Sequence, residues 1–254
     1  MDIKLCVVFV CNKPYFTKFI YSCSQLILNG KYTGNICLVV GDDLYNDDML
    51  KCEFILNNNI IIKHFPDIQF SDEFLNIQRV LNRLPAWFSK QFQFHKLHLF
   101  NIYFKKYDYI FYLDCGITIF SDISPILNEI TENTLLAHSD AYPNYEWKLH
   151  HQFDRTNRKY FNKLNYTYDL DVDYFQTTMM LYDTRIIYDD TYDNLFNLLI
   201  EYPISITNDQ GIIALYFTNI KPLFKQIKIK NDSTYFYDYM LRNENHNYIM
   251  LKMC

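Results

Sequence analysis

The sequence predicts a single α/β domain with a Rossmann-like, mixed but mostly parallel sheet that is flanked by helices. Continuous runs of β-branched and other apolar residues, typical of strands buried on both faces, alternate with segments of helical spacing. Half of the 254 residues are hydrophobic, which is enough for a substantial core. The five glycines form neither a Gly-x-Gly-x-x-Gly pattern nor a P-loop, which argues against dinucleotide-dependent dehydrogenases, P-loop NTPases and kinases.

In the first half of the chain, strand and helix patterns follow one another in order. Pro14 suits the first turn of a helix, Gly30 suits its C-terminal stop, and Ser71 suits the N-cap of the next helix. Phe92, Lys96 and Leu99 recur on one face of a further helix, together with Phe100, Tyr103 and Phe104. The predicted elements are strands over 3–12, 35–44 and 59–65 and helices over 13–30, 71–84 and 88–107.

The second half continues the alternation around one irregular segment. Residues 142–172 are polar and aromatic with poor periodicity, and we expect a long insertion or a flexible lid there. The predicted elements are strands over 108–114, 117–120, 177–183 and 224–230, a helix over 191–202 and a capped helix over 207–217.

Composition narrows the class of partner and the compartment. The net charge is −5 and no basic block exists, so we expect neither nucleic acid nor a polybasic membrane contact. The first apolar stretch is too short to span a membrane, which predicts a soluble, cytoplasmic protein. The seven cysteines lack Cys-x-x-Cys spacing and are predicted to be reduced core thiols. The bias toward Asn, Ile, Tyr and Lys would fit an AT-rich genome such as that of a large DNA virus, and then the host cytoplasm.

Acidic residues gather next to three of the five glycines, at Asp42–Asp43, Asp114 and Asp209. The first two positions follow predicted strands. In open sheets of this kind, ligands bind beyond the carboxyl ends of the strands. The pattern therefore predicts one shared polar crevice that suits a polar ligand or a metal.

Sugar transfer from a nucleotide diphosphate is one reaction that uses such a crevice without a glycine-rich loop. The leaving diphosphate gains negative charge as the glycosidic bond breaks, and a divalent ion can stabilise that charge. Mg²⁺ or Mn²⁺ prefers oxygen ligands, and Mn²⁺ tolerates a histidine.

Several segments, in the correct order through most of the chain, carry a resemblance to one family. "KYDYIFYLDCGITIFSDISPIL" (106–127) is similar to the segment around the Asp-x-Asp motif of GT-A-fold glycosyltransferases, closest to family 8 and its relatives. "DYFQTTMMLYDTRII" (173–187) resembles the segment that lines the donor sugar, and "TNDQGIIAL" (207–215) resembles the family's Asp-Gln motif. Residues 6–27 and 36–44 resemble its first strand and helix and its second strand.

The resemblance implies a GT-A-fold hexosyltransferase that moves a sugar from a nucleotide-diphospho sugar to a glycan, protein or small-molecule acceptor. A UDP-sugar is the favoured donor. A close relation to family 8 would imply retention of configuration. Residues 1–120 would form a nucleotide-binding half and residues 121–254 an acceptor half. Asp209 and Gln210 would contact the donor sugar as catalytic residues. Asp114 would face the ribose and any metal. The other implied donor-binding residues are Tyr15, Asp42, Asp43, Lys96, Cys115, Gly116, Gln176 and Thr177.

The main departure from the family is Gly116, which stands where the motif has its second acid and main metal ligand. Either Mn²⁺ or Mg²⁺ is held by Asp114, His246 and the diphosphate, or no metal is essential. In the second case Lys90 and Lys96 are candidates to neutralise the diphosphate.

Ordinary structural roles remain open for these residues. Asp114 could cap a turn, Asp209 could be part of a helix cap with Thr207 or Asn208, and His246 could be a surface histidine. Two other functions also stay open: a catalytically degenerate module that binds a nucleotide sugar or a partner protein, and a sugar nucleotidyltransferase. Against the second, no glycine follows the first strand in "FVCNKPYF".

Overall fold

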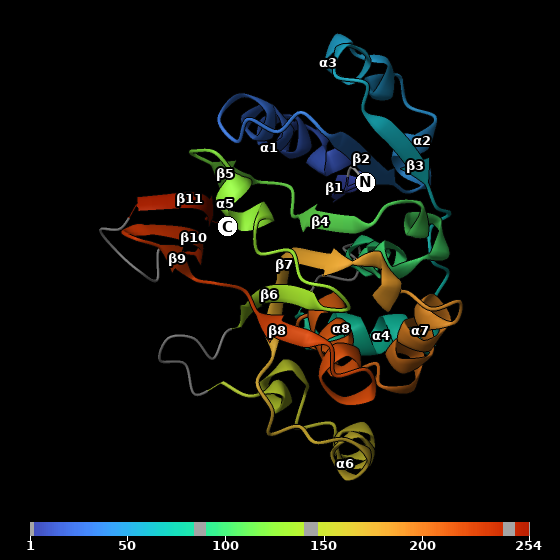
Figure 1. Ribbon diagram of the computed structural model, residues 1–254. Coiled ribbons are helices and arrows are strands. Elements are labelled where there is room, and N and C mark those ends of the chain that lie inside the picture. Colours follow the sequence, from blue (N-terminus) through green and yellow to red (C-terminus); the bar gives the residue numbers. More distant parts are fainter. Residues whose placement is uncertain (1–2, 84–89, 140–146, 241–246, 254) are drawn as a thin grey trace.

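The computed structural model describes residues 3–83, 90–139, 147–240 and 247–253, and these form a seven-stranded sheet next to a four-stranded one (Figure 1). The larger sheet has the order β3-β2-β1-β4-β7-β6-β8. Strand β7 is antiparallel to both of its neighbours and the other pairs are parallel, as the sequence predicted. Its strands are β1 Leu5–Cys11, β2 Asn35–Val40, β3 Ile61–His64, β4 Tyr109–Leu113, β6 Leu135–Ser139, β7 Phe175–Asp183 and β8 Phe224–Gln226.

Helices cover both faces of this sheet, because its central strands are apolar on both sides. Along β1, Val7 and Phe9 pack into one core with helix α1, whereas Val8 and Val10 pack into the other core with α4, α7 and α8. Ser71 caps α4 as predicted, since its hydroxyl accepts a hydrogen bond from the Phe74 amide at 3.3 Å. The helices are α1 Phe16–Leu28, α2 Asp42–Tyr45, α3 Glu53–Asn57, α4 Asp72–Leu81, α5 Ser124–Leu127, α6 Arg158–Thr167, α7 Thr191–Glu201 and α8 Asp209–Leu215.

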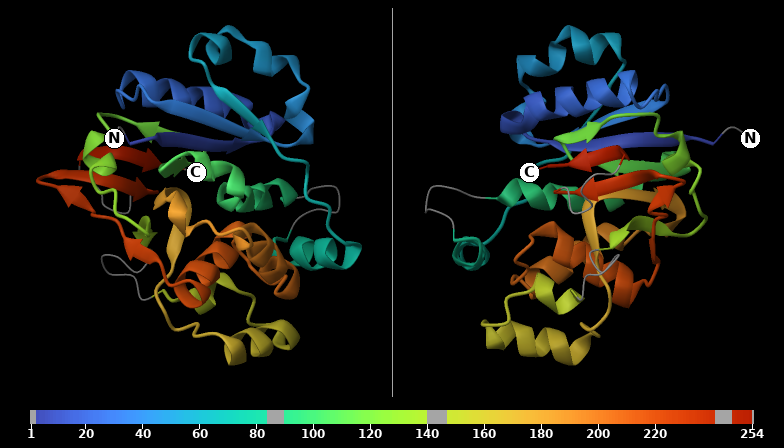
Figure 2. Two further views of the ribbon diagram at one scale, coloured as in Figure 1. Left: turned by 45° about the vertical axis from the view of Figure 1, so that its right-hand side comes forward. Right: turned by 90° about the vertical axis from the view of Figure 1, so that its left-hand side faces the viewer.

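The smaller sheet, with the order β5-β11-β10-β9, was only partly foreseen. The views in Figure 2 agree in placing its red strands beside the green segment that contains β5. Strand β11 runs antiparallel to β5, with Lys252 opposite Ile117. This pairing brings residues near position 250 next to the loop that follows β4. The strands are β5 Ile117–Ile119, β9 Lys230–Asn231, β10 Thr234–Tyr239 and β11 Asn247–Lys252.

Several predicted elements differ in the structure. The strand predicted over 35–44 ends at Val40, and residues 42–44 belong to α2. The helix predicted over 88–107 consists, in its described part, of two 3₁₀ segments, Gln91–Phe100 and Ile102–Lys106. Extended backbone at Asn101 separates them, and its side chain accepts a hydrogen bond from the Tyr103 amide at 3.0 Å, so it caps the second segment. The strand predicted over 224–230 is split into β8 and β9. The predicted insertion contains a 3₁₀ turn, Leu149–Gln152, and α6, which lies at the bottom of Figure 1.

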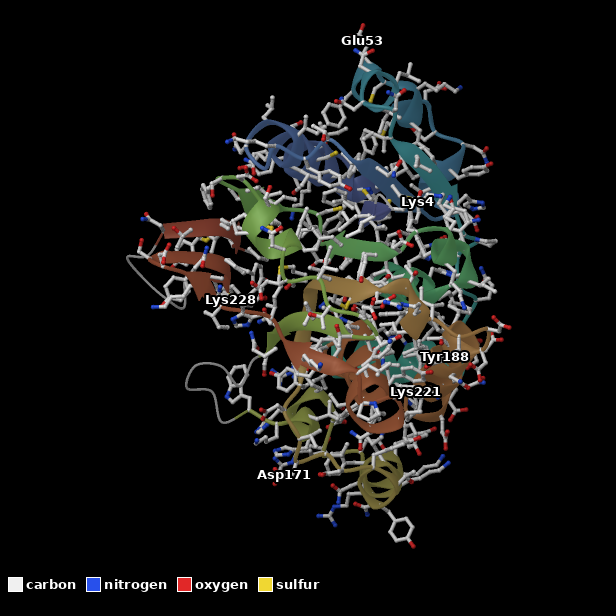
Figure 3. The ribbon with its side chains drawn as sticks, viewed as in Figure 1. Lys4, Glu53, Asp171, Tyr188, Lys221 and Lys228 are labelled. Carbon is white, nitrogen blue, oxygen red and sulfur yellow. The ribbon has the colours of Figure 1, made fainter. Side chains whose placement is uncertain are left out.

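The described part of the chain shows where charged side chains lie, whether a helix could cross a membrane, and the state of the cysteines. Charged side chains such as Glu53, Asp171 and Lys228 lie at the outside of the molecule (Figure 3). No helix there combines the length and apolar character that a bilayer crossing needs. Cys6, Cys11, Cys23, Cys37, Cys52 and Cys115 are free thiols, and all except Cys52 are buried.

Candidate active site

The antiparallel direction of β7 places its beginning beside the end of β4. Leu113 pairs with Met179, and the amide of Asp114 donates to the carbonyl of Thr178 at 2.9 Å. The start of α8 lies against the same edge, because Thr177 contacts Asp209. Three segments that are far apart in the sequence therefore meet where the parallel strands β1 and β4 end.

A cavity of about 930 Å³ opens at this edge. It brings together most of the residues that the sequence singled out. The lining includes Tyr15, Lys90, Lys96, Asp114, Cys115, Gln176, Thr177, Asp209 and Gln210.

Asp42 and Asp43, at the start of α2, are not among the described residues that line the cavity. Asp42 accepts from the backbone amide of Asp67 at 3.1 Å and pairs with His64 at 2.7 Å. These contacts hold the pKa of Asp42 below its usual value, the backbone hydrogen bond having the largest effect. Asp43 accepts from the amide of Lys13 at 3.0 Å. Both carboxylates are thus engaged in joining loops at the end of β2.

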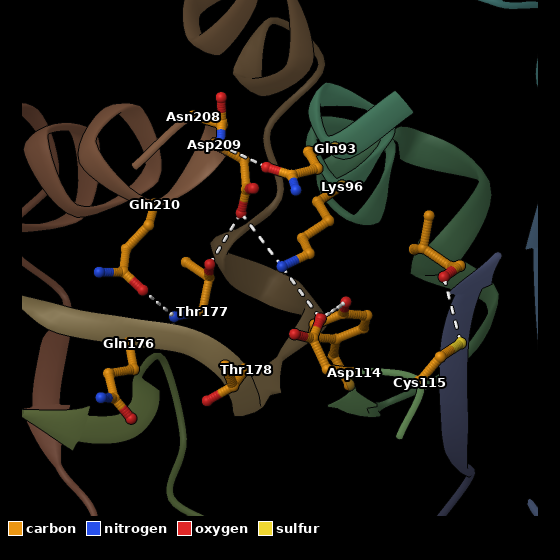
Figure 4. A network of polar contacts seen from close by, with 12 residues as sticks. Gln93, Lys96, Asp114, Cys115, Gln176, Thr177, Thr178, Asn208, Asp209 and Gln210 are labelled. Carbon is orange, nitrogen blue, oxygen red and sulfur yellow. Dashed lines mark hydrogen bonds and ion pairs between the residues drawn. The ribbon is translucent and has the colours of Figure 1, made fainter. Parts of the chain in front are cut away.

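Lys96 is the central cation of the site (Figure 4). Its ammonium lies 2.9 Å from Asp114 Oδ1 and 3.4 Å from Asp209 Oδ2. The side chain is only 15% exposed and that of Asp209 only 4%. Burial opposes the charge of the amine, but the two carboxylates raise the pKa of Lys96. Burial also raises the pKa of Asp209, against the opposing effect of Lys96.

A chain of hydrogen bonds fixes the Asp-Gln pair at the start of α8. The Thr177 hydroxyl donates to Asp209 Oδ2 at 2.7 Å, and the Thr177 amide donates to Gln210 Oε1 at 3.2 Å. Gln210 Nε2 donates to Gln152 Oε1 at 2.9 Å, and the Thr207 hydroxyl donates to the same oxygen at 2.6 Å. Gln152 belongs to the segment that the sequence identified only as a polar insertion, where no local pattern marks it.

Helix α8 has no side-chain cap, contrary to the capped helix that the sequence predicted. Asn208, the N-cap residue, has φ 55° and ψ −116°. Its side-chain amide donates instead to Gln93, on the segment that carries Lys96. Asparagine adopts positive φ more readily than most residues, and strained backbone of this kind is common at functional sites.

Around Gly116 the site is cationic. Gly116 has φ +87°, and a Cβ atom there would lie 3.4 Å from Lys252 Nζ and 3.6 Å from Lys18 Cδ. Lys252 donates to the carbonyl of Cys115 at 2.7 Å and lies 4.0 Å from Asp114 Oδ2. Lys18 and Lys252 also line the cavity, and the sequence had marked neither.

These residues do not fit a metal held by the protein. Within the described ranges, no cluster of three or more His, Cys, Asp or Glu side chains is placed to bind a cation. Asp114 Oδ1 already contacts Lys96 and the Tyr112 hydroxyl, and Oδ2 faces Lys252. Mg²⁺ and Mn²⁺ need several oxygen ligands, and ammonium groups repel them. His246 lies outside the described residues.

Comparison with known proteins supports the fold. The sequence matches no protein-family profile and no curated protein. Among solved structures it is similar to the galactosyltransferase LgtC in complex with donor and acceptor sugar analogs, with a TM-score of 0.61 and 12% identity over 98% of this chain and 87% of that one. Core-mannan synthase A (CmsA/Ktr4) from Aspergillus fumigatus in its Mn/GDP form has a TM-score of 0.56 and 10% identity over 89% of this chain and 73% of that one. Mouse xyloside xylosyltransferase 1 has a TM-score of 0.51 and 13% identity over 96% of this chain and 89% of that one.

These likenesses define the class of fold. The chain has the GT-A fold of these glycosyltransferases, as the sequence predicted. At 10–14% identity they establish the architecture rather than a particular donor or acceptor.

Proposed function

We propose that this protein is a glycosyltransferase that moves a hexose from a nucleotide-diphospho sugar to a hydroxyl of a glycan, protein or small-molecule acceptor. The favoured donor is a UDP-sugar, and the second candidate is a GDP-sugar. One observation carries the proposal. The segments around Asp114, Gln176 and Asp209, which are distant in the sequence, line one cavity at the carboxyl ends of strands in a GT-A fold.

The charges of the cavity suit an anionic donor. Its lining, as far as the structure describes it, contains four lysines and two aspartates, and Lys96 lies between the two carboxylates. Tyr15, which is half exposed at the end of the first strand, supplies an aromatic face for a base. In the reaction the bond between the anomeric carbon and the diphosphate oxygen breaks, and its electron pair stays on that oxygen. The acceptor oxygen forms the new bond, and its proton passes to the released diphosphate or to water.

Asp209 and Gln210 are the side chains that we place beside the donor sugar. Both are held from behind, Asp209 by Thr177 and Lys96 and Gln210 by Gln152, so their positions are set before a ligand arrives. One LgtC structure with a TM-score of 0.60 is an active-site mutant in which glutamate replaces glutamine, which supports a role for a glutamine in that enzyme. Retention of configuration belongs to the same proposal, and NMR of the product anomer would test it.

An apolar rim suits a sugar acceptor. Trp147 and Ile206 line the cavity, and their side chains are exposed. A flat aromatic ring with a polar edge packs well against the apolar face of a sugar ring. We therefore place the acceptor on the Trp147 side of the cavity.

A thermal-shift panel of UDP-, GDP-, CMP- and dTDP-sugars, each with and without Mn²⁺, tests the proposed function. At about 100 times its dissociation constant a donor adds about 2.7 kcal/mol of stability. For a chain of this size this corresponds to a rise in Tm of roughly 5–10 °C. Stabilisation by UDP- or GDP-sugars followed by measurable transfer supports the proposal. If no nucleotide sugar raises Tm, the proposal is wrong, and binding without transfer or hydrolysis identifies a degenerate binding module instead.

A further inference from the structure

Among the described residues, the lysines at the Gly116 end of the cavity outnumber the carboxylates that could neutralise them. Asp114 and Asp209 are the aspartates of this described lining, and Lys96 contacts both. Lys252 reaches Asp114 only at 4.0 Å, whereas it donates a 2.7 Å hydrogen bond to the neutral carbonyl of Cys115. The described part of the lining therefore has more positive than negative side chains.

Lys252 is also held in place, which distinguishes it from a mobile surface lysine. Its side chain is 12% exposed, and the pairing of β11 with β5 fixes its backbone opposite Ile117. Lys18 on α1 approaches the same point, because both lysines are neighbours of the Cβ position of Gly116. A glycine at this position leaves the space between the two side chains open.

We propose that Lys252 and Lys18 bind the diphosphate of the donor and stabilise the negative charge of the leaving group, so that no divalent metal is needed. This inference rests on the proposed function and names the charge-bearing groups of that site. A nucleotide-diphospho sugar has a negative charge on each of its two phosphates. Two lysines beyond the Lys96 ion pairs supply the matching positive charge.

The side chains available as metal ligands in this loop explain why lysines take this role. With Gly116 in the loop after β4, Asp114 remains as the carboxylate there, and both of its oxygens face ammonium groups. A divalent ion beside Asp114 would have to approach Lys96 and Lys252 closely, which like-charge repulsion opposes. Lys252 Nζ instead lies at the position that a side chain at residue 116 would reach.

Isothermal titration calorimetry of the whole chain with UDP and GDP, after treatment with EDTA and again with Mn²⁺, tests this inference. Whichever of UDP and GDP binds, we expect its affinity after EDTA treatment and its affinity with Mn²⁺ to agree within about threefold. We expect Lys252→Met to weaken that binding by about tenfold or more, because a buried ion pair is lost. The same substitution should weaken the binding of UMP or GMP less, because these nucleotides lack the second phosphate.

Two further variants keep the test decisive. Lys18→Met changes an exposed side chain, so it should fold even if Lys252→Met does not, and it should weaken diphosphate binding by about threefold or more. Lys228→Met, at an exposed position away from the cavity, should bind like the wild type. Diphosphate binding that requires Mn²⁺, or that both cavity variants leave unchanged, overturns the inference while the proposed function stands. If neither UDP nor GDP binds in any condition, the proposed function itself fails.

Discussion

Replacing Lys96 with methionine should test the electrostatic centre of the site. The substitution keeps the length of the side chain and removes the ammonium that lies 2.9 Å from Asp114 and 3.4 Å from Asp209. Asp114 can still be reached by Lys252, whereas Asp209, only 4% exposed, retains Thr177 as its hydrogen-bond donor. The variant therefore leaves one buried carboxylate without a cation.

The size of the effect follows from this loss. Removing one partner of a buried ion pair costs about 3–5 kcal/mol of the free energy of unfolding. For a chain of this length the corresponding fall in Tm is on the order of 10 °C. Burial already raises the pKa of Asp209, and losing Lys96 raises it further. A group whose pKa is higher in the folded than in the unfolded state favours folding at low pH, so the variant should lose less stability at pH 5 than at pH 8.

Urea unfolding followed by tyrosine and tryptophan fluorescence at both pH values measures this prediction. The double variant Lys96→Met/Asp209→Asn removes both charges and should recover part of the lost stability. Lys228→Met, on the surface, should unfold like the wild type. A loss below about 1 kcal/mol that is the same at pH 5 and pH 8 would refute the proposed role of Lys96 as the counter-ion of a buried acid.

The remaining predictions concern donor, acceptor, pH and stability. Asp114→Asn should lower donor turnover by at least about 30-fold in a transfer assay, because a partly buried charge pair is broken, and unchanged turnover would remove Asp114 from the site. Trp147→Ala should raise the KM for the acceptor more than it changes kcat; an unchanged KM would place the acceptor elsewhere. Burial lowers the pKa of Lys252, so diphosphate affinity measured by calorimetry should fall as pH rises toward the usual pKa of lysine, and the fall should be smaller in Lys252→Met. Ser71→Ala should cost about 1 kcal/mol in urea unfolding because α4 loses its cap, and an unchanged midpoint would contradict that role.

The parts of the fold that could be read from the sequence are those with a local signal. Strands β1 and β4 are runs of apolar residues because both of their faces are buried. The cavity could be foreseen in part, since an acid that follows such a run lies at the end of the sheet. Asp114 follows β4 in this way and lines the cavity, whereas Asp42 and Asp43, which follow β2, are not among its described lining residues.

The missed parts depend on contacts between distant segments. Strand β11 has six residues, and it is defined by pairing with β5 and β10 rather than by its own pattern. Lys252 therefore could not be assigned to the site from its neighbours in sequence. The segment around Lys96 has helical spacing, but local capping by Asn101 splits it into two 3₁₀ segments. Gln152 looks like any polar residue of an irregular stretch until Gln210 is placed beside it.

The contact between Lys252 and the carbonyl of Cys115 joins residues that are 137 positions apart. Closing a loop of this length costs conformational entropy, and long-range strand pairing of this kind is slow. A partly folded chain could contain β4 and Lys96 but would lack the ammonium that β11 supplies. Full affinity for a diphosphate would then require the pairing of β11 with β5. The binding of a diphosphate would report complete folding, and in the cell it would favour fully folded molecules over partly folded ones.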